Sequence, residues 1–365
     1  MKGFGVAALL LILAGASHAQ VGDPARGSTL YHTTYKCTDC HGDPPNPNLL
    51  QDRLLLLNGT TAAGILAAMN DSTSGMSNYL SSLGQKPQDL ADLAAYIATL
   101  SPPANLNYQG LWWAAPANSE SGWGINFAHQ GDTIFASWFT YDLTGKGLWL
   151  VMTAPKTGPG VYSGTLYTTK GPPFNAVPFN PAQVTATAVG NGTLTFGDAN
   201  NGAFSYTVNG TVQNKTITRE VFGTLPICAT AASSASLTAA TNYQDLWWAA
   251  PAGSESGWGI NLNHESDTIF ATWFTYDLDG SPMWLVVTAG KTAPGVYTGT
   301  LYRTTGPPFN SVPFNPANVA ATAVGTATFT FADGNDATFA YTVNGVAQQK
   351  TITREVFSGA GTVCQ

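Results

Sequence analysis

An internal duplication covers most of the chain and constrains its fold more than any other feature. Residues 107–222 and 242–357 align without a gap at an offset of 135, and 84 of the 116 aligned positions are identical. All ten tryptophans lie in these copies, five in each. The duplication predicts two similar units in tandem, joined by the small-residue segment 230–241. A recent duplication also preserves identity, so a matched residue is not thereby functional.

Each copy has the pattern of an all-β unit. Runs rich in β-branched and aromatic residues, such as 132–142, alternate with glycine-containing turns. In one run, Phe204, Tyr206 and Val208 share a face, as in a half-buried strand. We expect seven or eight strands per copy with short connections, except for the proline-rich loop 170–183. This predicts an antiparallel meander, and leaves a closed barrel and a sandwich as alternatives.

The first residues have the pattern of a secretory signal peptide. Lys2 precedes an apolar run from Val6 to Leu13, and small residues Ser17 and Ala19 lie before a cleavage point at Gln20. The segment is too short for a membrane span, and no later run approaches 18 apolar residues. We therefore expect residues 1–19 to be removed and the protein to be periplasmic or extracellular, with no membrane span.

The charge balance argues against nucleic acid as a partner. Only 10% of the residues are charged and the net charge is −7. Phosphate backbones are bound mainly by Lys and Arg, which are scarce here. The sequence therefore predicts other partners.

A Cys-x-x-Cys-His run lies between the signal peptide and the duplication, at Cys37, Cys40 and His41. A structural zinc site needs a second close pair of ligands, and a redox dithiol needs a strand-to-helix junction. The surrounding sequence indicates neither. Attachment of haem c needs two thiols at this spacing and a following histidine that ligates the iron. We therefore expect one covalent haem, bound through Cys37 and Cys40, with His41 on the iron.

The residues around this run predict a small helical domain. Asp23 and Pro24 are typical of a helix start, and apolar residues at helical spacing follow over 90–97, before prolines at 102–103. About eighty residues bury little apolar surface by themselves, so a haem would complete the core.

Segment 22–101 resembles the class I cytochrome c family. Gly27 and Tyr31 look like the glycine and aromatic residue of that family's first helix, and Tyr96 looks like the aromatic residue of its last helix. The resemblance implies an all-α fold around the haem. It also implies that the Pro47 carbonyl accepts the proton of His41 Nδ1, and that Met76 is the second axial ligand.

Two other residues compete with Met76 for the iron. Met69 continues the apolar face of a helix, so it also fits a place in the helix core. His32 lies on the first helix and would give two histidine ligands. With His41 and Met76 both bound, the iron would have no open site and would transfer single electrons.

Cys228 and Cys364 end the two copies. Neither has a cysteine partner in its own copy, so in an oxidising compartment we expect a disulfide between them, with buried thiols as the alternative.

Three further patterns in the copies each have two interpretations. The pairs Trp112–Trp113 and Trp247–Trp248 fit a sugar-stacking platform or a lid over the end of a barrel. Glu120, Asn126 and His129, which recur as Glu255, Asn261 and His264, fit a polar site or scattered polar groups. Arg219 and Arg354 would each need a carboxylate partner if they faced the core.

The prediction as a whole is a multidomain protein. It comprises a signal peptide (1–19), an all-α cytochrome c domain (20–104) and two all-β repeats (105–229 and 242–365) joined by a linker (230–241). The favoured function is an exported electron carrier, rather than a catalyst, whose repeats dock to a redox partner protein or a surface. The alternatives are a haem-linked oxidoreductase that holds a substrate in the repeats, and a secreted carbohydrate- or surface-binding protein.

Overall fold

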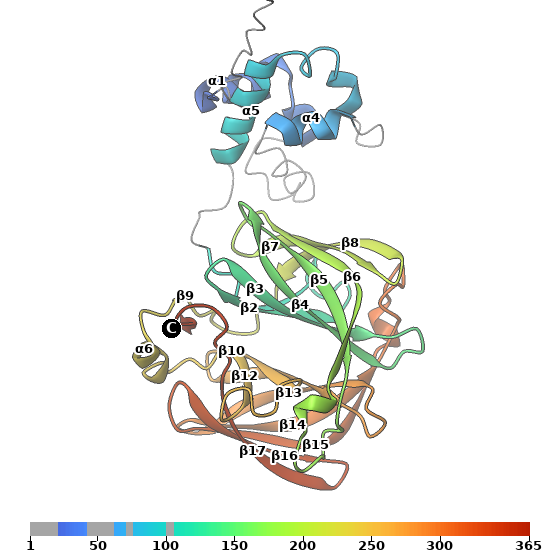
Figure 1. Ribbon diagram of the computed structural model, residues 1–365, viewed down its shortest axis with the longest axis vertical. Helices are drawn as coiled ribbons and strands as arrows, with labels where there is room; N and C mark the ends of the chain where they lie inside the picture. Colours follow the sequence, from blue (N-terminus) through green and yellow to red (C-terminus); the bar gives the residue numbers. More distant parts are fainter. Residues whose placement is uncertain (1–20, 42–61, 71–75, 100–105) are drawn as a thin grey trace, which may run out of the picture. The chain divides into compact units, whose positions relative to one another are not determined.

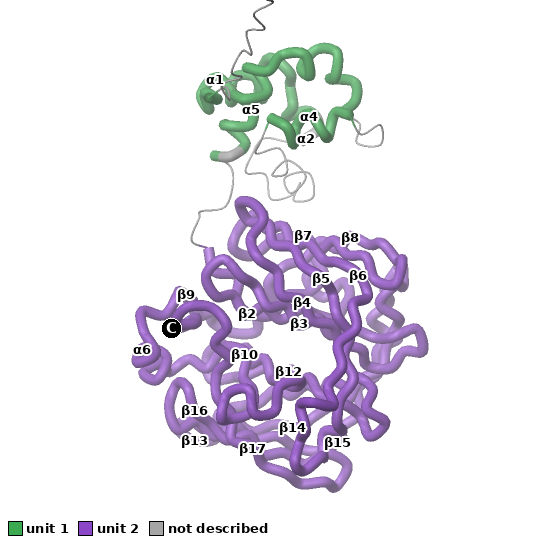
Figure 2. Tube along the Cα trace, in the orientation of Figure 1, with its two compact units in different colours: residues 1–45, 56–100 green, residues 46–55, 101–365 purple. Residues whose placement is uncertain are grey.

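The computed structural model describes residues 21–41, 62–70, 76–99 and 106–365. The chain divides into two compact units, residues 1–45 with 56–100 and residues 46–55 with 101–365, which Figure 2 shows in different colours. The expected signal peptide and Pro47 lie outside the described residues. No helix among the described residues is long and apolar enough to cross a membrane.

The described part of the first unit consists of short helices. They are α1 (Pro24–Thr29), the π-helix η1 (Leu30–Thr34), α2 (Thr38–His41), α4 (Ala62–Asn70), the 3-10 helix η3 (Met76–Tyr79) and α5 (Pro87–Thr99). The Asp23 side chain caps α1 by accepting from two backbone N–H groups. Gly27 lets α1 approach α5 closely, because an added Cβ would lie 1.9 Å from the Asp92 carbonyl oxygen. The rings of Tyr31 and Tyr96 meet at 5.5 Å.

The expected fold class, which opens with an all-α cytochrome c domain, is wrong. The described structure is mostly β, and the longest helix described in the first unit, α5, has 13 residues. Helix caps and apolar spacing are local signals, and many small helical segments share them. They predicted helices but did not specify the arrangement of a particular family.

The second unit contains two closed eight-stranded antiparallel barrels (Figure 1). The first comprises β1 (Gly110–Ala114), β2 (Gly124–Gln130), β3 (Thr133–Tyr141), β4 (Gly147–Gly158), β5 (Val161–Lys170), β6 (Thr185–Phe196), β7 (Asn201–Val208) and β8 (Thr211–Arg219). The second comprises β10 (Asp245–Ala249), β11 (Gly259–Glu265), β12 (Thr268–Tyr276), β13 (Pro282–Ala293), β14 (Val296–Thr305), β15 (Ala320–Phe331), β16 (Asp336–Val343) and β17 (Val346–Arg354).

Each barrel closes by pairing its first strand with its last. Trp112 on β1 is opposite Arg219 on β8, and Trp247 on β10 is opposite Arg354 on β17. Closure leaves no open sheet edge in either meander. The meander part of the fold prediction therefore agrees with the structure, as a barrel rather than a sandwich.

Aromatic side chains fill the interior of each barrel. In the first barrel the Tyr108 and Phe196 rings stack with centroids 3.7 Å apart, and Trp112 is fully buried beside them. The second barrel repeats this stack with Tyr243 and Phe331 at 3.5 Å. The interiors are therefore packed cores. We expect a ligand site on the outer faces of the barrels or at the junction between them.

The proline-rich loop of each barrel packs against the other barrel. In the first loop, residues 171–184, the Phe174 N–H donates to Tyr276 O at 2.9 Å, and the Phe174 carbonyl accepts from Tyr341 OH at 3.0 Å. The second loop, residues 306–319, makes the equivalent contacts with the first barrel. The Phe309 N–H donates to Tyr141 O at 2.9 Å, and Tyr206 OH donates to Phe309 O at 3.0 Å. In Figure 1 the green segment near residue 180 reaches β14 and β15 of the second barrel.

Further reciprocal hydrogen bonds join the two barrels. Trp149 Nε1 donates to Thr275 O at 3.0 Å, and Trp284 Nε1 donates to Thr140 O at 2.8 Å. Because these loop and indole contacts recur with the barrels exchanged, the junction has the character of a two-fold interface within one chain. The buried hydrophobic cluster also runs through both barrels.

A small sheet beside the barrels joins the ends of the two copies. Strands β9 (Cys228–Thr230) and β18 (Thr362–Cys364) pair antiparallel, and a disulfide links Cys228 to Cys364. Helix α6 (Ser234–Thr238) lies in the connecting segment, and its Leu237 is buried. A disulfide of this kind is typical of proteins outside the cytoplasm.

The division into separate β-domains at residues 229 and 242 stays a prediction. The reciprocal loops lead us to expect that the two barrels unfold together. We predict that Phe174→Ala destabilises the whole β-unit by about 3 kcal/mol, because a buried aromatic side chain leaves a cavity against the partner barrel. Phe309→Ala should have the same effect. Chemical denaturation followed by tryptophan fluorescence measures both.

The matched control is Val177→Ala in the same loop, where the side chain is 81% exposed. It should change stability by less than about 0.5 kcal/mol. Two separate unfolding transitions, with each Phe variant shifting only one, would show that the barrels are independent.

Candidate functional site

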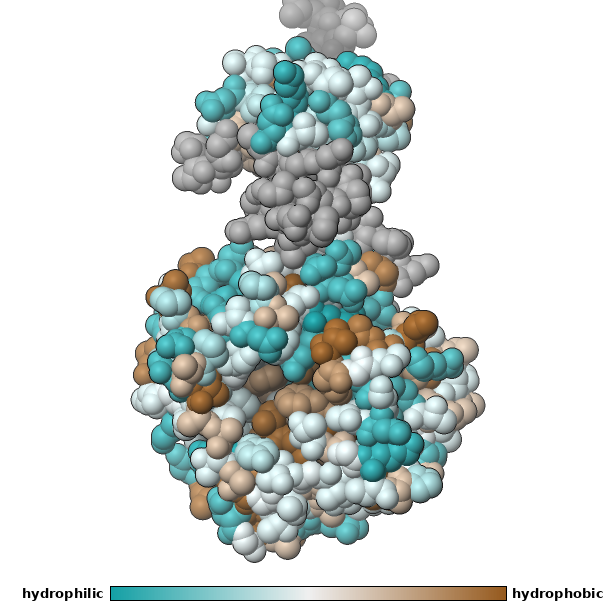
Figure 3. All heavy atoms as spheres, turned by 180° about the vertical axis from the view of Figure 1, so that it is seen from behind, coloured by the Kyte–Doolittle hydropathy of each residue, from teal (hydrophilic) through white to brown (hydrophobic). Residues whose placement is uncertain are grey.

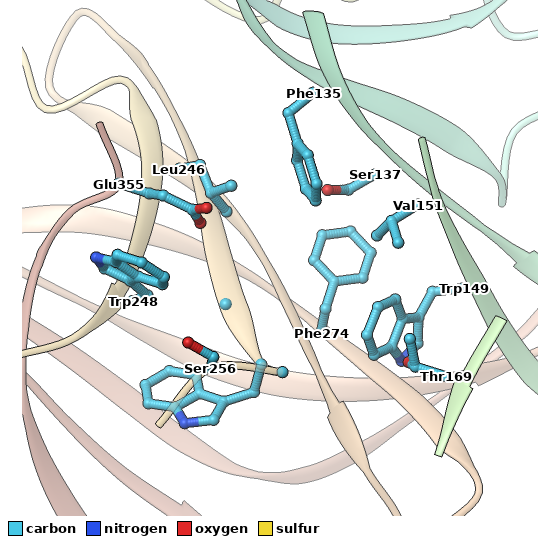
Figure 4. Close-up of a pocket in the computed structure, with 13 residues that line it drawn as sticks. Phe135, Ser137, Trp149, Val151, Thr169, Leu246, Trp248, Ser256, Phe274 and Glu355 are labelled. Carbon is cyan, nitrogen blue, oxygen red and sulfur yellow. The ribbon is translucent and has the colours of Figure 1, made fainter. Parts of the chain in front are cut away.

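A cavity of about 330 Å³ lies between the outer faces of the two barrels. Its lining residues, shown in Figure 4, are Phe135, Ser137, Trp149, Val151, Thr169, Leu246, Trp248, Ser256, Gly257, Trp258, Gly259, Phe274 and Glu355. Strands β3, β4 and β5 supply the first-barrel side. Strands β10, β11 and β12, with the loop before β11 and the residue after β17, supply the other side. Because both barrels contribute, the cavity, which we call the inter-barrel cleft, exists only when they are packed together.

Strand alternation explains how one tryptophan of the Trp247–Trp248 pair reaches the cleft. Adjacent residues on β10 point to opposite faces. Trp247 is fully buried inside the barrel, whereas Trp248 is only partly buried and lines the cleft. One member of this pair therefore belongs to the barrel core and the other to the cleft.

Two other indole rings of the cleft are held by hydrogen bonds. Trp149 Nε1 donates to the Thr275 carbonyl, and the Trp149 ring lies 5.7 Å from Phe274. Trp258 Nε1 donates to Glu255 Oε2 at 2.9 Å, and Lys350 lies over the Trp258 ring at 5.2 Å. These contacts preorganise flat apolar surfaces, which reduces the entropy lost when a ligand packs against them.

Glu355 is the single ionisable side chain of the lining. Figure 4 shows its carboxylate directed into the space between the two sets of residues. Burial, and secondarily the charge of Asp245, raises the pKa of Glu355 to about 7. Among the described residues no side-chain hydrogen bond or ion pair reaches this carboxylate. The cleft therefore has an acidic hydrogen-bonding group, and its lining has no cation that would attract an anion.

The surface of the β-unit also has a hollow with apolar residues around it. Figure 3, seen from behind, shows a hollow in the β-unit with brown, hydrophobic residues gathered around it. Sites for small ligands are usually concave, largely apolar and provided with a few polar groups, and this one matches that description.

Of the two interpretations of Glu120, Asn126 and His129, the structure supports scattered polar groups. Glu120 pairs with Lys215 and accepts from Trp123 Nε1, whereas Asn126 contacts the second barrel through Asn263 at 2.8 Å. His129 lies in the barrel core, where burial lowers its pKa to about 4 and keeps it neutral. The structure therefore disperses these groups, and His264 has the same environment in the second copy.

The two equivalent arginines are stabilised differently. Arg354 is buried and pairs with Asp245 at 3.1 Å, as an arginine facing the core requires. Arg219 bonds backbone carbonyls, including those of Gln109 and Ala199, because Gly110 occupies the position equivalent to Asp245. Both guanidinium groups also lie over the buried Trp of the adjacent strand.

Two of the expected haem-binding residues have described side chains. Cys37 and Met76 are partly buried, and each packs against the hydrophobic cluster of the first unit. Met69 is fully buried in that cluster, and His32 Nδ1 contacts the Ser28 carbonyl at 2.7 Å. The side chains of Cys40 and His41 lie outside the described residues. Haem attachment and the ligands His41 and Met76 therefore stay predictions. No group of three His, Cys, Asp or Glu in the described part could hold a metal ion.

Sequence reasoning missed most of the cleft. Trp149 and Phe274 lie on strands of different copies, and Glu355 follows the last strand of the second barrel, far from both in the sequence. No local pattern distinguishes them from other residues of β-strands.

The Glu355 pKa predicts a dependence of stability on pH. The folded pKa of about 7 exceeds the ordinary value of 4.5, so the folded state binds this proton more tightly than the unfolded state. The stabilising contribution is complete below pH 4.5 and is lost as the pH rises to about 7. We predict that Glu355→Gln reduces this pH-dependent loss in the free energy of unfolding by at most about 3 kcal/mol. Urea denaturation between pH 4.5 and about 7 measures the difference.

Asp132→Asn provides the control, since that carboxylate is 78% exposed. An unchanged pH profile in Glu355→Gln would contradict the assignment of a buried, proton-binding carboxylate.

Covalent haem attachment can be tested without reference to function. Haem c bonded through two thioethers stays with the protein in acidified acetone. We predict retained pigment in the wild-type chain after export, and no retained pigment in the Cys37→Ser/Cys40→Ser double variant. Complete extraction of pigment from the wild type would exclude the thioether bonds.

Comparisons with known proteins assign no family. No family profile and no curated protein matches this chain. One solved structure, a double mutant of the vaccine antigen transferrin binding protein B from Haemophilus parasuis, is similar over 66% of this chain and 60% of that chain. The identity is 10% and the TM-score is 0.18, so this likeness carries no argument about function. The identification as a class I cytochrome c, and the electron-carrier function built on it, are wrong: no family match supports them, and two β-barrels form most of the structure.

Proposed function

We propose that this chain is an exported binding protein, located in the periplasm or outside the cell, and that its inter-barrel cleft binds neutral carbohydrate. The observation that carries the proposal is the cleft itself. Three tryptophans and two phenylalanines surround its volume of about 330 Å³. This size is at the lower end for ligand sites and suits one short ligand segment.

The lining favours ligands with both an apolar face and polar edges. The indole rings of Trp149, Trp248 and Trp258 offer flat surfaces for the C–H faces of pyranose rings. Polar groups at the same cavity, Ser256 and Glu355, are placed to bond hydroxyl groups. A fully apolar ligand would leave these polar groups without partners, at a cost in free energy.

The charge of the cleft lining further restricts the class of ligand that can bind. Glu355 is the one ionisable group of the lining, and near neutral pH it exchanges between neutral and anionic forms. An anionic ligand would meet no compensating cation in the lining. A neutral sugar can donate to the carboxylate or accept from the carboxyl group, so it fits both forms.

Titration calorimetry with cellohexaose, chitohexaose and maltohexaose tests the proposal. At least one should bind, and we predict that Trp248→Ala weakens binding about tenfold or more. A tenfold change corresponds to about 1.4 kcal/mol, which a lost stacking ring at the centre of a site can supply.

Leu143→Ala is a suitable control, because its side chain is 68% exposed on the β3–β4 turn and is not among the residues that line the cleft. It should leave the affinity unchanged. If none of the three hexasaccharides binds, or if both variants bind equally well, the carbohydrate proposal is wrong.

A further inference from the structure

The residue types that line the cleft occur in both copies of the duplication. Each lining residue has a counterpart 135 positions away in the other copy: Phe270, Thr272, Trp284, Val286, Thr304, Leu111, Trp113, Ser121, Gly122, Trp123, Gly124, Phe139 and Glu220. Twelve of these thirteen counterparts are the same residue type, and the thirteenth replaces Ser137 with Thr272.

The counterparts have equivalent environments. Trp113 is partly buried next to the fully buried Trp112, as Trp248 is next to Trp247. Trp123 Nε1 donates to Glu120 Oε2 at 2.9 Å, which repeats the bond that holds Trp258. Burial raises the pKa of Glu220 to about 7, with Glu265 adding to the effect, so this carboxyl group resembles Glu355.

The two-fold character of the junction brings the counterparts together across it. Trp284 of the second barrel contacts Phe139 of the first at 4.9 Å, which mirrors the contact of Trp149 with Phe274. From this repetition, and resting on the proposed function, we infer that the chain has a second carbohydrate site on the opposite side of the junction, and that Phe139 closes it.

The position of Phe139 supports closure. A Cβ added to Gly124 would lie only 2.6 Å from Phe139 Cζ, so the ring rests against this glycine. At the equivalent Gly259, an added Cβ would meet Leu246 Cδ1 at 3.2 Å, and no atom of Phe274 lies within 4 Å. The Phe139 ring therefore occupies the space that the Phe274 ring leaves open.

Different affinities follow for the two sites. A ligand at the second site must first displace the Phe139 ring, and that conformational cost lowers the observed affinity. Thr272 adds a methyl group, and its hydroxyl contacts Asn126 Nδ2 at 3.4 Å. The wild-type chain should bind two ligands, one tightly at the open cleft and one at least tenfold more weakly at the second site.

Two sites would suit a polymeric ligand. One chain could hold two segments of a polysaccharide, and the effective concentration at the second site would then raise the overall avidity. A weak second site contributes substantially in this setting, whereas it would be nearly empty with short, dilute oligosaccharides.

Equilibrium titration of the full exported chain tests the second site with two probes, chitohexaose and the neutral fluorescent dye Prodan. The dye reports apolar cavities whether or not sugars bind. We expect two equivalents of Prodan in the wild type. Trp248→Phe should weaken the strong site and Trp113→Phe the weak one, each at least fivefold. Thermal melts identify any variant that fails to fold.

Phe139→Leu and Phe274→Leu form the matched pair for closure. Phe139→Leu should tighten the weak site at least fivefold, and Phe274→Leu should not tighten either site. If the wild type binds one equivalent of dye, and neither Trp113→Phe nor Phe139→Leu changes dye binding, the second site is wrong and the first cleft stands. Two equivalents of dye, with no binding of chitohexaose, cellohexaose or maltohexaose, would support two sites and count against carbohydrate as their ligand.

Discussion

The reciprocal packing of two loops onto opposite barrels is the interaction on which the rest of the β-unit depends. Phe174 and Phe309 each bring a backbone carbonyl to a tyrosine hydroxyl of the other barrel, and each ring packs on a tryptophan there. A barrel alone would leave these surfaces in water. The chain thereby contains both halves of an isologous interface, and the connecting segment and the Cys228–Cys364 disulfide hold them together.

This packing also explains where a ligand site can form. Stacked aromatic side chains pack the interiors of both barrels, whereas the cavity of about 330 Å³ lies between the barrels. The junction leaves a cleft because curved outer faces meet imperfectly. Hydrogen bonds fix the indole rings of Trp149 and Trp258 there, and burial raises the pKa of Glu355 to about 7. The site is rigid, apolar and weakly acidic, a combination that favours neutral rings with hydroxyl edges.

The sequence was informative where structure is local and repeated. Alternation along 202–210 and the gapless duplication predicted antiparallel strands in two equivalent units. The lack of a second cysteine in either copy suggested that Cys228 pairs with Cys364. Closure into barrels and the exchange of loops depend on contacts between distant residues, which periodicity does not encode. The single difference between Gly110 and Asp245 likewise explains why one arginine has a carboxylate partner and the other does not. The cytochrome c identification failed because it relied on a short motif with helical neighbours.

The central claim is that the inter-barrel cleft holds a carbohydrate against its tryptophans. The most direct measurement is a proton–nitrogen correlation spectrum of the ten tryptophan indoles, recorded while each hexasaccharide is added. The account predicts that the signals of Trp248, Trp258 and Trp149 shift first, while those of the barrel-core residues Trp112 and Trp247 stay in place. Shifts confined to other indoles, or an unchanged spectrum with all three sugars at millimolar concentration, would contradict it.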